Sequence, residues 1–182
     1  MKKTLAILLA LMLSISLLVG CGGDGSGGGS SNAKTATSTY TPEDGKYSIS
    51  LTYPESADYR WSTDTADFRI SSIHKAAVIG PDFKIGIGPI TYPMGVKNVE
   101  ELKTRRAENY EVADVTYGSL KGFSYYDSGY TSYVIILPIE GNQIHYIQLM
   151  VSDPNNSEAR IHDLFKSDAV QNILKTVQIK AN

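Results

Sequence analysis

The chain has 182 residues, which is enough for one ordinary globular domain with appendages. Hydrophobic residues make up 42% and charged residues 20%, which excludes a wholly disordered chain and a protein built of several membrane-spanning helices. The formal net charge of −2 comes without the clustered Lys and Arg that phosphate binding needs, so we expect no nucleic-acid partner. The single cysteine excludes an internal disulfide and any metal site built from several cysteines.

Residues 1–20 have the layout of a secretory signal peptide. Lys2 and Lys3 give a positive start, and the uncharged stretch from Thr4 to Gly20 is rich in Leu, Ile, Ala and Val. This stretch is short for a membrane-spanning helix, and no positive flank follows it. We therefore expect residues 1–20 to direct export. The alternative is an uncleaved anchor helix with an incidental cysteine.

The segment Leu18-Val19-Gly20-Cys21 resembles the lipobox of bacterial lipoproteins. It ends the apolar stretch, contains the only cysteine and precedes a glycine-rich run. The resemblance implies transfer of a diacylglyceryl group to the sulfur of Cys21 and cleavage between Gly20 and Cys21. Two acyl chains suffice for stable anchoring, at about 0.8 kcal/mol per buried methylene. We therefore expect a protein anchored by lipid to the extracytoplasmic face of a cell membrane.

A flexible tether is expected between the anchor and the folded domain. Residues 22–39 contain six glycines and no large apolar side chain, so they cannot form a core. The sequence thus predicts lipidated Cys21 with its tether over residues 21–39 and a single globular domain over residues 40–182.

The first part of this domain shows the alternation of apolar and polar residues that is typical of half-buried strands. These strands are expected over Lys46–Tyr53, Tyr59–Trp61, Asp67–His74 and Phe83–Ile90. Pro54 should end the first of them.

The pattern then changes to helical spacing over residues 97–110, with Asn98 and Glu101 at the spacing of a capping box. Four short segments bounded by turn residues follow and predict an antiparallel meander over residues 112–117, 120–127, 130–139 and 143–151. The last two segments are apolar on both faces, so we expect them at the centre of the sheet.

A second helix is expected after an N-cap at Asn155, with Glu158 at capping-box spacing, and a last strand over Val177–Lys180. Runs of strands interrupted by helices indicate the α+β class. The expected architecture is an antiparallel sheet of about six to eight strands with two main helices packed on it.

The order of these elements resembles the PsbP/DcrB-like fold, an α/β/α sandwich around an antiparallel sheet. The resemblance lies in Tyr53-Pro54, Trp61, the helix over residues 96–110, the hairpins over residues 118–151 and the closing segment over residues 165–170. It implies a small extracytoplasmic protein, often a lipoprotein, that acts as an assembly or interaction factor without catalysis.

No residue pattern in the chain selects a catalytic, cofactor or metal site. His74, His145 and His162 lack a second His or Cys at ligand spacing. The run from Asp153 to Ser157 begins like a calcium loop, but Glu158 occupies the glycine position, so we interpret it as a helix cap. No serine lies in a Gly-x-Ser-x-Gly motif. We therefore expect no cofactor, no bound metal and no enzymatic activity.

Tyrosine is the unusual feature of the domain. Six tyrosines fall on neighbouring predicted strands, at Tyr117, Tyr125, Tyr126, Tyr130, Tyr133 and Tyr146. Tyrosine combines a rigid apolar ring with a polar tip and is enriched at recognition surfaces, although β-propensity and core filling also favour it. Tyr125 and Tyr126 are consecutive on a strand and should point to opposite faces.

Gly86 and Gly88 share one face of their predicted strand, and because glycine has no side chain they leave that face open. The interpretation we favour is close packing of a helix against that face, and the alternative is a shallow ligand groove. With the six tyrosines, these glycines form the candidate binding surface.

Three functions remain open on the sequence. The first is a non-enzymatic interaction or assembly module that binds an envelope protein. The second is a small-ligand-binding lipoprotein that uses the tyrosine-rich sheet. The third is a cell-envelope hydrolase, which would need His145 or His162 beside a carboxylate and a serine in an open cleft.

Overall fold

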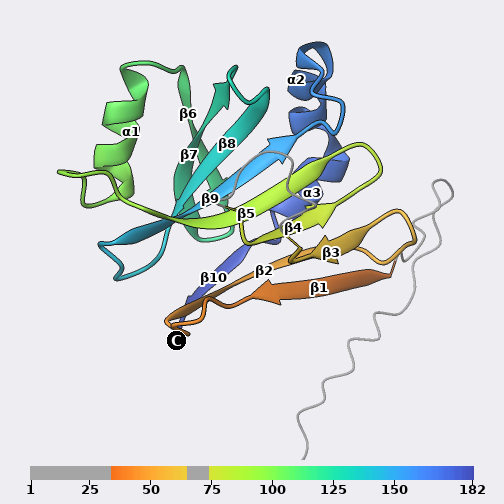
Figure 1. The fold of residues 1–182 in the computed structure, drawn as a ribbon, viewed down its shortest axis with the longest axis horizontal. Coiled ribbons are helices and arrows are strands. Elements are labelled where there is room, and N and C mark those ends of the chain that lie inside the picture. Colours follow the sequence, from red (N-terminus) through yellow and green to blue (C-terminus); the bar gives the residue numbers. More distant parts are fainter. Residues whose placement is uncertain (1–33, 65–73) are drawn as a thin grey trace, which may run out of the picture. The chain divides into compact units, whose positions relative to one another are not determined.

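The computed structural model describes residues 34–64 and 74–182, and these residues form two antiparallel sheets and three helices (Figure 1). The larger sheet has seven strands in the order β3-β4-β5-β9-β8-β7-β6. Its strands are β3 (Arg60–Ser62), β4 (Ala76–Ile79), β5 (Lys84–Thr91), β6 (Val112–Tyr117), β7 (Leu120–Asp127), β8 (Ser132–Pro138) and β9 (His145–Ser152). The predicted α+β class and antiparallel pairing are confirmed.

The smaller sheet has the order β1-β2-β10. Its strands are β1 (Thr35–Tyr40), β2 (Tyr47–Pro54) and β10 (Gln178–Ala181). The sequence had suggested one sheet, and this second sheet is a correction. It exists because β2 pairs with β1 and β10 instead of with a strand of the meander.

The strand β1 corrects the boundary of the tether, which was expected to run to residue 39. Thr37 Oγ1 lies 2.8 Å from Thr52 Oγ1, and Thr39 Oγ1 lies 2.9 Å from the Ser50 hydroxyl, so the strand is joined to β2 through side chains as well as backbone. Threonine is β-branched and favours extended backbone, which outweighs the polar composition of this segment. Residues 35–39 therefore belong to the folded domain.

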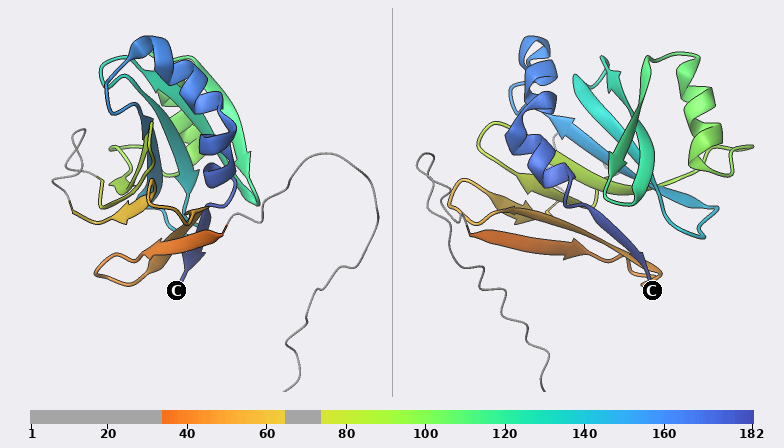
Figure 2. Two further views of the ribbon diagram at one scale, coloured as in Figure 1. Left: turned by 90° about the vertical axis from the view of Figure 1, so that its right-hand side faces the viewer. Right: turned by 180° about the vertical axis from the view of Figure 1, so that it is seen from behind.

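Helix α1 (Val99–Ala107) packs on one face of the seven-stranded sheet, while α2 (Glu158–Lys166) and α3 (Asp168–Leu174) lie on the other face (Figure 2). Two apolar cores result. The first core lies on the face of α2 and α3, which it shares with the three-stranded sheet, and includes Ile49, Leu51, Ile85, Ile135, Leu149 and Ile173. The second core lies under α1 and includes Leu102, Phe123, Tyr125, Ile136, Tyr146 and Met150.

The predicted capping box of α1 is confirmed. The side-chain oxygen of Asn98 accepts the backbone N–H of Glu101 at 2.9 Å, and the Glu101 carboxylate accepts the N–H of Lys97 at 2.9 Å. The first bond satisfies a backbone donor that the first turn of a helix leaves without a partner, and the second fixes the residue before the N-cap.

The predicted N-cap at Asn155 is wrong, because α2 begins later, after Ser157. The Asp153 carboxylate instead accepts the N–H of Asn155 at 3.0 Å, and Asn156 adopts a left-handed φ of 51°, which is a turn conformation. The expected single helix is also divided. Ser167 ends α2 and caps α3, and its hydroxyl accepts the N–H of Val170 at 3.4 Å.

The sequence predicted the four strands of the meander, β6 to β9, and their antiparallel pairing. Strands β6 and β7 have the expected bounds, and β9 lies at the centre of the sheet between β5 and β8. The strand β4 was not predicted. The strand expected over residues 67–74 falls almost wholly outside the described residues, as do the signal peptide and Cys21.

Candidate functional site

The six predicted tyrosines separate between the two faces of the sheet. Tyr117, Tyr125 and Tyr146 are core residues, each no more than 5% exposed. Tyr130 lies in a turn and is 53% exposed. Tyr126 and Tyr133 are half-buried partners across β7 and β8, on the face of α2.

Tyr126 and Tyr133 open into a cleft of about 460 Å³, which we call the Tyr cleft. It lies where the chain leaves α1 and enters β6, and α2 forms its other wall. Its lining residues are Asn109, Tyr110, Glu111, Ala113, Ser124, Tyr125, Tyr126, Ser128, Tyr133 and His162. The volume lies within the range of about 300–1,000 Å³ that is typical of small-molecule sites.

One wall of the cleft is an aromatic group formed by Tyr126, Tyr133 and His162. The ring centroids of Tyr126 and His162 lie 4.7 Å apart, and those of Tyr126 and Tyr133 lie 5.6 Å apart. The Tyr133 hydroxyl lies 2.8 Å from His162 Nδ1, which holds α2 to β8 through a hydrogen bond. Phe165 stacks on Tyr133 from behind, with centroids 4.0 Å apart and planes at 5°. The wall is therefore supported from the side away from the cleft.

Burial and nearby carboxylates raise the pKa values of the two tyrosines in this aromatic wall. Burial raises the pKa of Tyr126, and the negative charges of Glu158 and Asp127 raise it further. Burial and then the charge of Glu111 raise the pKa of Tyr133. Both phenols are therefore neutral near pH 7, and they lie in a region of negative potential. The Tyr126 hydroxyl is buried and makes no hydrogen bond of good geometry within the described part of the chain.

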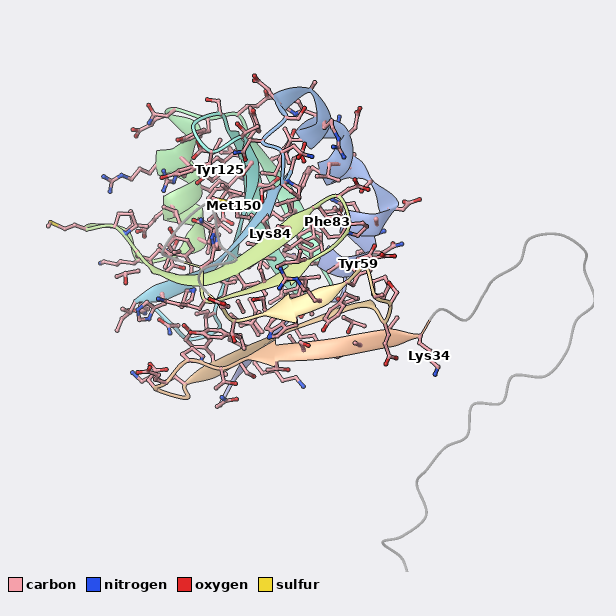
Figure 3. The ribbon with its side chains drawn as sticks, turned by 45° about the vertical axis from the view of Figure 1, so that its right-hand side comes forward. Lys34, Tyr59, Phe83, Lys84, Tyr125 and Met150 are labelled. Carbon is pink, nitrogen blue, oxygen red and sulfur yellow. The ribbon has the colours of Figure 1, made fainter. Side chains whose placement is uncertain are left out.

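Two tyrosines of the lining, Tyr110 and Tyr125, also pack in the second core on the opposite face. Tyr125 contacts Tyr110 at a centroid distance of 4.6 Å, and the Arg106 guanidinium carbon lies 5.6 Å from the centre of the Tyr125 ring. Burial raises the pKa of Tyr125 to about 12. Figure 3 shows Tyr125 and Met150 together among the side chains beneath α1, where both belong to the second core.

Gly86 and Gly88 do not line the Tyr cleft. A Cβ atom on Gly86 would lie 3.0 Å from the imidazole ring of His74, so this ring occupies the space that we had assigned to a helix or to a groove. His74 is 2% exposed, and burial together with the charge of Lys84 lowers its pKa to about 4. The candidate surface thus reduces to Tyr125, Tyr126 and Tyr133.

The sequence offers His162 only as a candidate for a hydrolase cleft, and it does not indicate Tyr110 as a lining residue. Tyr110 falls within the helix that the spacing predicts over residues 97–110, but α1 ends at Ala107 and leaves Tyr110 in the following loop. His162 reaches the cleft only because α2 crosses β8. No local pattern signals either residue, since both depend on how distant segments pack.

The catalytic arrangement required for a hydrolase is incomplete. Ser124, Ser128, Glu111 and His162 line the same cleft. However, in the described part of the chain the side chain of His162 bonds to Tyr133 and to neither serine. Across residues 34–64 and 74–182, no three His, Cys, Asp or Glu side chains are grouped so that they could hold a metal ion. None of the helices in these ranges is long and apolar enough to span a membrane.

No protein-family model and no curated protein sequence matches the chain. Among solved structures, the chain is similar to the solution structure of cyanobacterial PsbP (CyanoP) from Synechocystis sp. PCC 6803. The TM-score is 0.40 at 11% identity, over 86% of this chain and 98% of that one. This likeness concerns the arrangement of helices and strands, and no functional residue is carried over from it.

Proposed function

We propose that this protein is a lipoprotein anchored to the extracytoplasmic face of a membrane, with a folded domain that binds a partner and catalyses no reaction. The observation that carries the proposal is the segment Leu18-Val19-Gly20-Cys21, which ends an apolar leader and contains the only cysteine of the chain. With β1 beginning at Thr35, residues 22–34 form the tether, and their root-mean-square reach is about 20 Å. Such a tether keeps the domain within reach of partners at the membrane surface.

Binding of a small ligand is the form of this function that the Tyr cleft favours. The cleft combines aromatic side chains, polar groups and a suitable volume, which is the usual composition of a small-molecule site. A serine hydrolase is less favoured, because the imidazole of His162 is bonded to a tyrosine instead of to a nucleophile.

The anchor is tested by replacing its acceptor sulfur in the full chain expressed with its own leader. We expect Cys21→Ser to remain an unprocessed precursor or to appear in the soluble secreted fraction, because serine does not accept the diacylglyceryl group. Membrane fractionation followed by immunoblotting measures this, with Ser26→Ala in the tether as the matched control. A Cys21→Ser protein that stays fully processed in the membrane contradicts the anchor.

A further inference from the structure

Carboxylates outnumber cations around the Tyr cleft. Glu111 is the carboxylate in the lining, which contains no Lys or Arg. Glu158 on α2 and Asp127 at the end of β7 act on Tyr126 from outside the lining. Arg106 is a cation beside the lining: its guanidinium carbon lies 5.6 Å from the centre of the Tyr125 ring, which both lines the cleft and belongs to the second core.

Aromatic rings and carboxylates together recognise a particular chemical class. A ring face carries partial negative charge and attracts a cation placed within about 6 Å of its centre, by about 0.5–1 kcal/mol when exposed and about 2 kcal/mol or more when desolvated. Tyr110, Tyr126 and Tyr133 supply such rings to the cleft, and Glu111 supplies a full negative charge. The phenols remain neutral, so their rings keep the quadrupole that attracts cations.

We propose that the Tyr cleft binds a small organic cation with a substituted ammonium group, between the tyrosine rings and Glu111. This inference rests on the small-ligand form of the proposed function and names its ligand class. An anionic ligand fits poorly because it would face Glu111 without a Lys or Arg in the lining to neutralise it. A neutral sugar would use the rings and the polar groups of Asn109 and Ser128 but would gain nothing from the negative potential.

The direct test uses two cations and a neutral analogue of one of them, so that this pair differs only in charge. The full chain is extracted from membranes in dodecyl maltoside, a detergent without an ammonium group, and titrated calorimetrically. The probes are choline, tetramethylammonium and 3,3-dimethylbutan-1-ol, the neutral carbon analogue of choline. We expect both cations to bind and the neutral analogue to bind at least about tenfold more weakly, because the cation–π and ionic terms are lost.

Variants then test whether the cations bind in the Tyr cleft. Tyr126→Leu removes a ring and should weaken choline binding by about three- to thirtyfold, whereas Tyr126→Phe keeps the ring and should bind as the parent protein does. Glu111→Gln should weaken binding by about two- to fivefold at low salt and less at high salt. Tyr130→Leu changes an exposed tyrosine outside the lining and should leave binding unchanged.

Three outcomes overturn the proposal. The first is that neither cation binds up to about 10 mM, which is weaker than the usual range of specific small-ligand sites. The second is equal binding of choline and its neutral analogue. The third is binding of N-acetylglucosamine that Tyr126→Leu abolishes while neither cation binds, which would assign the cleft to sugars. None of these outcomes bears on lipidation, which membrane fractionation of Cys21→Ser measures separately.

Discussion

Tyr125 and Tyr126 are neighbours in the chain but belong to different regions of the molecule. Tyr125 points into the second core and contacts Tyr110 and Arg106. Tyr126 points to the opposite face and lines the Tyr cleft beside His162, whereas Tyr125, which is 4% exposed, only borders that cleft. Because strand residues alternate between faces, one tyrosine fills a core and the next is available for recognition. A cluster of tyrosines in a sequence is therefore not a single site.

Removing each ring in turn should have the largest effect on stability. Tyr125→Ala should lower the free energy of unfolding by about 3–5 kcal/mol, because it leaves a cavity in a closed core. Tyr126→Ala should cost less, about 1–2 kcal/mol, because one side of the ring already faces a cleft. Urea unfolding followed by circular dichroism measures both values. Equal losses would show that the two faces are packed alike.

A second test uses pH and the histidine next to Gly86. His74 has its pKa lowered to about 4, so the folded protein holds it neutral, while the unfolded chain takes up a proton near pH 6.5. Its stabilising contribution is complete above about pH 6.5 and is lost as pH falls towards 4, by about 3 kcal/mol in total.

Urea unfolding of the parent protein and of His74→Gln at pH 7.5, 5.5 and 4 measures this contribution. We expect the free energy of unfolding of the variant to depend less on pH over this window. The same pH dependence in both proteins would mean that His74 is not held neutral by burial. His162 on the opposite face differs from His74 in that its side chain is half-exposed instead of buried.

A smaller change in stability is expected from substitutions at the starts of α1 and α2, which lie on the two faces of the sheet. Asn98→Ala should destabilise the protein by about 1 kcal/mol, because it removes the side-chain bond to the N–H of Glu101. Asn155→Ala should have almost no effect, because Asn155 does not cap α2. Thermal unfolding of both variants checks the difference. A larger loss of stability in Asn155→Ala than in Asn98→Ala would show that Asn155 does cap α2.

These two helix starts also indicate what a sequence can and cannot predict. The capping box of α1 is local, and its spacing was sufficient to place it. The start of α2 depends on the left-handed turn at Asn156, which competes with the same kind of spacing. The strand β1 was missed for a related reason, since its threonines look like tether residues until β2 lies beside them.

The candidate site was predictable only in part. The alternation of side chains on β7 was enough to place Tyr125 and Tyr126 on opposite faces. It did not show which face was covered, because that depends on where α1 and α2 pack. His162 joins Tyr133 across about thirty residues of sequence, and the ring of His74 occupies the face of Gly86. Such contacts between distant segments are decided by packing and leave no local pattern.

Lipidation of Cys21 is decided by the mass of the mature protein. Intact mass spectrometry of the full-length protein, expressed with its own leader and extracted from membranes, should give a chain that begins at Cys21 and carries a diacylglyceryl group. A chain that begins at Met1 without any acyl mass would contradict the anchor, and with it the placement of the Tyr cleft outside the cell.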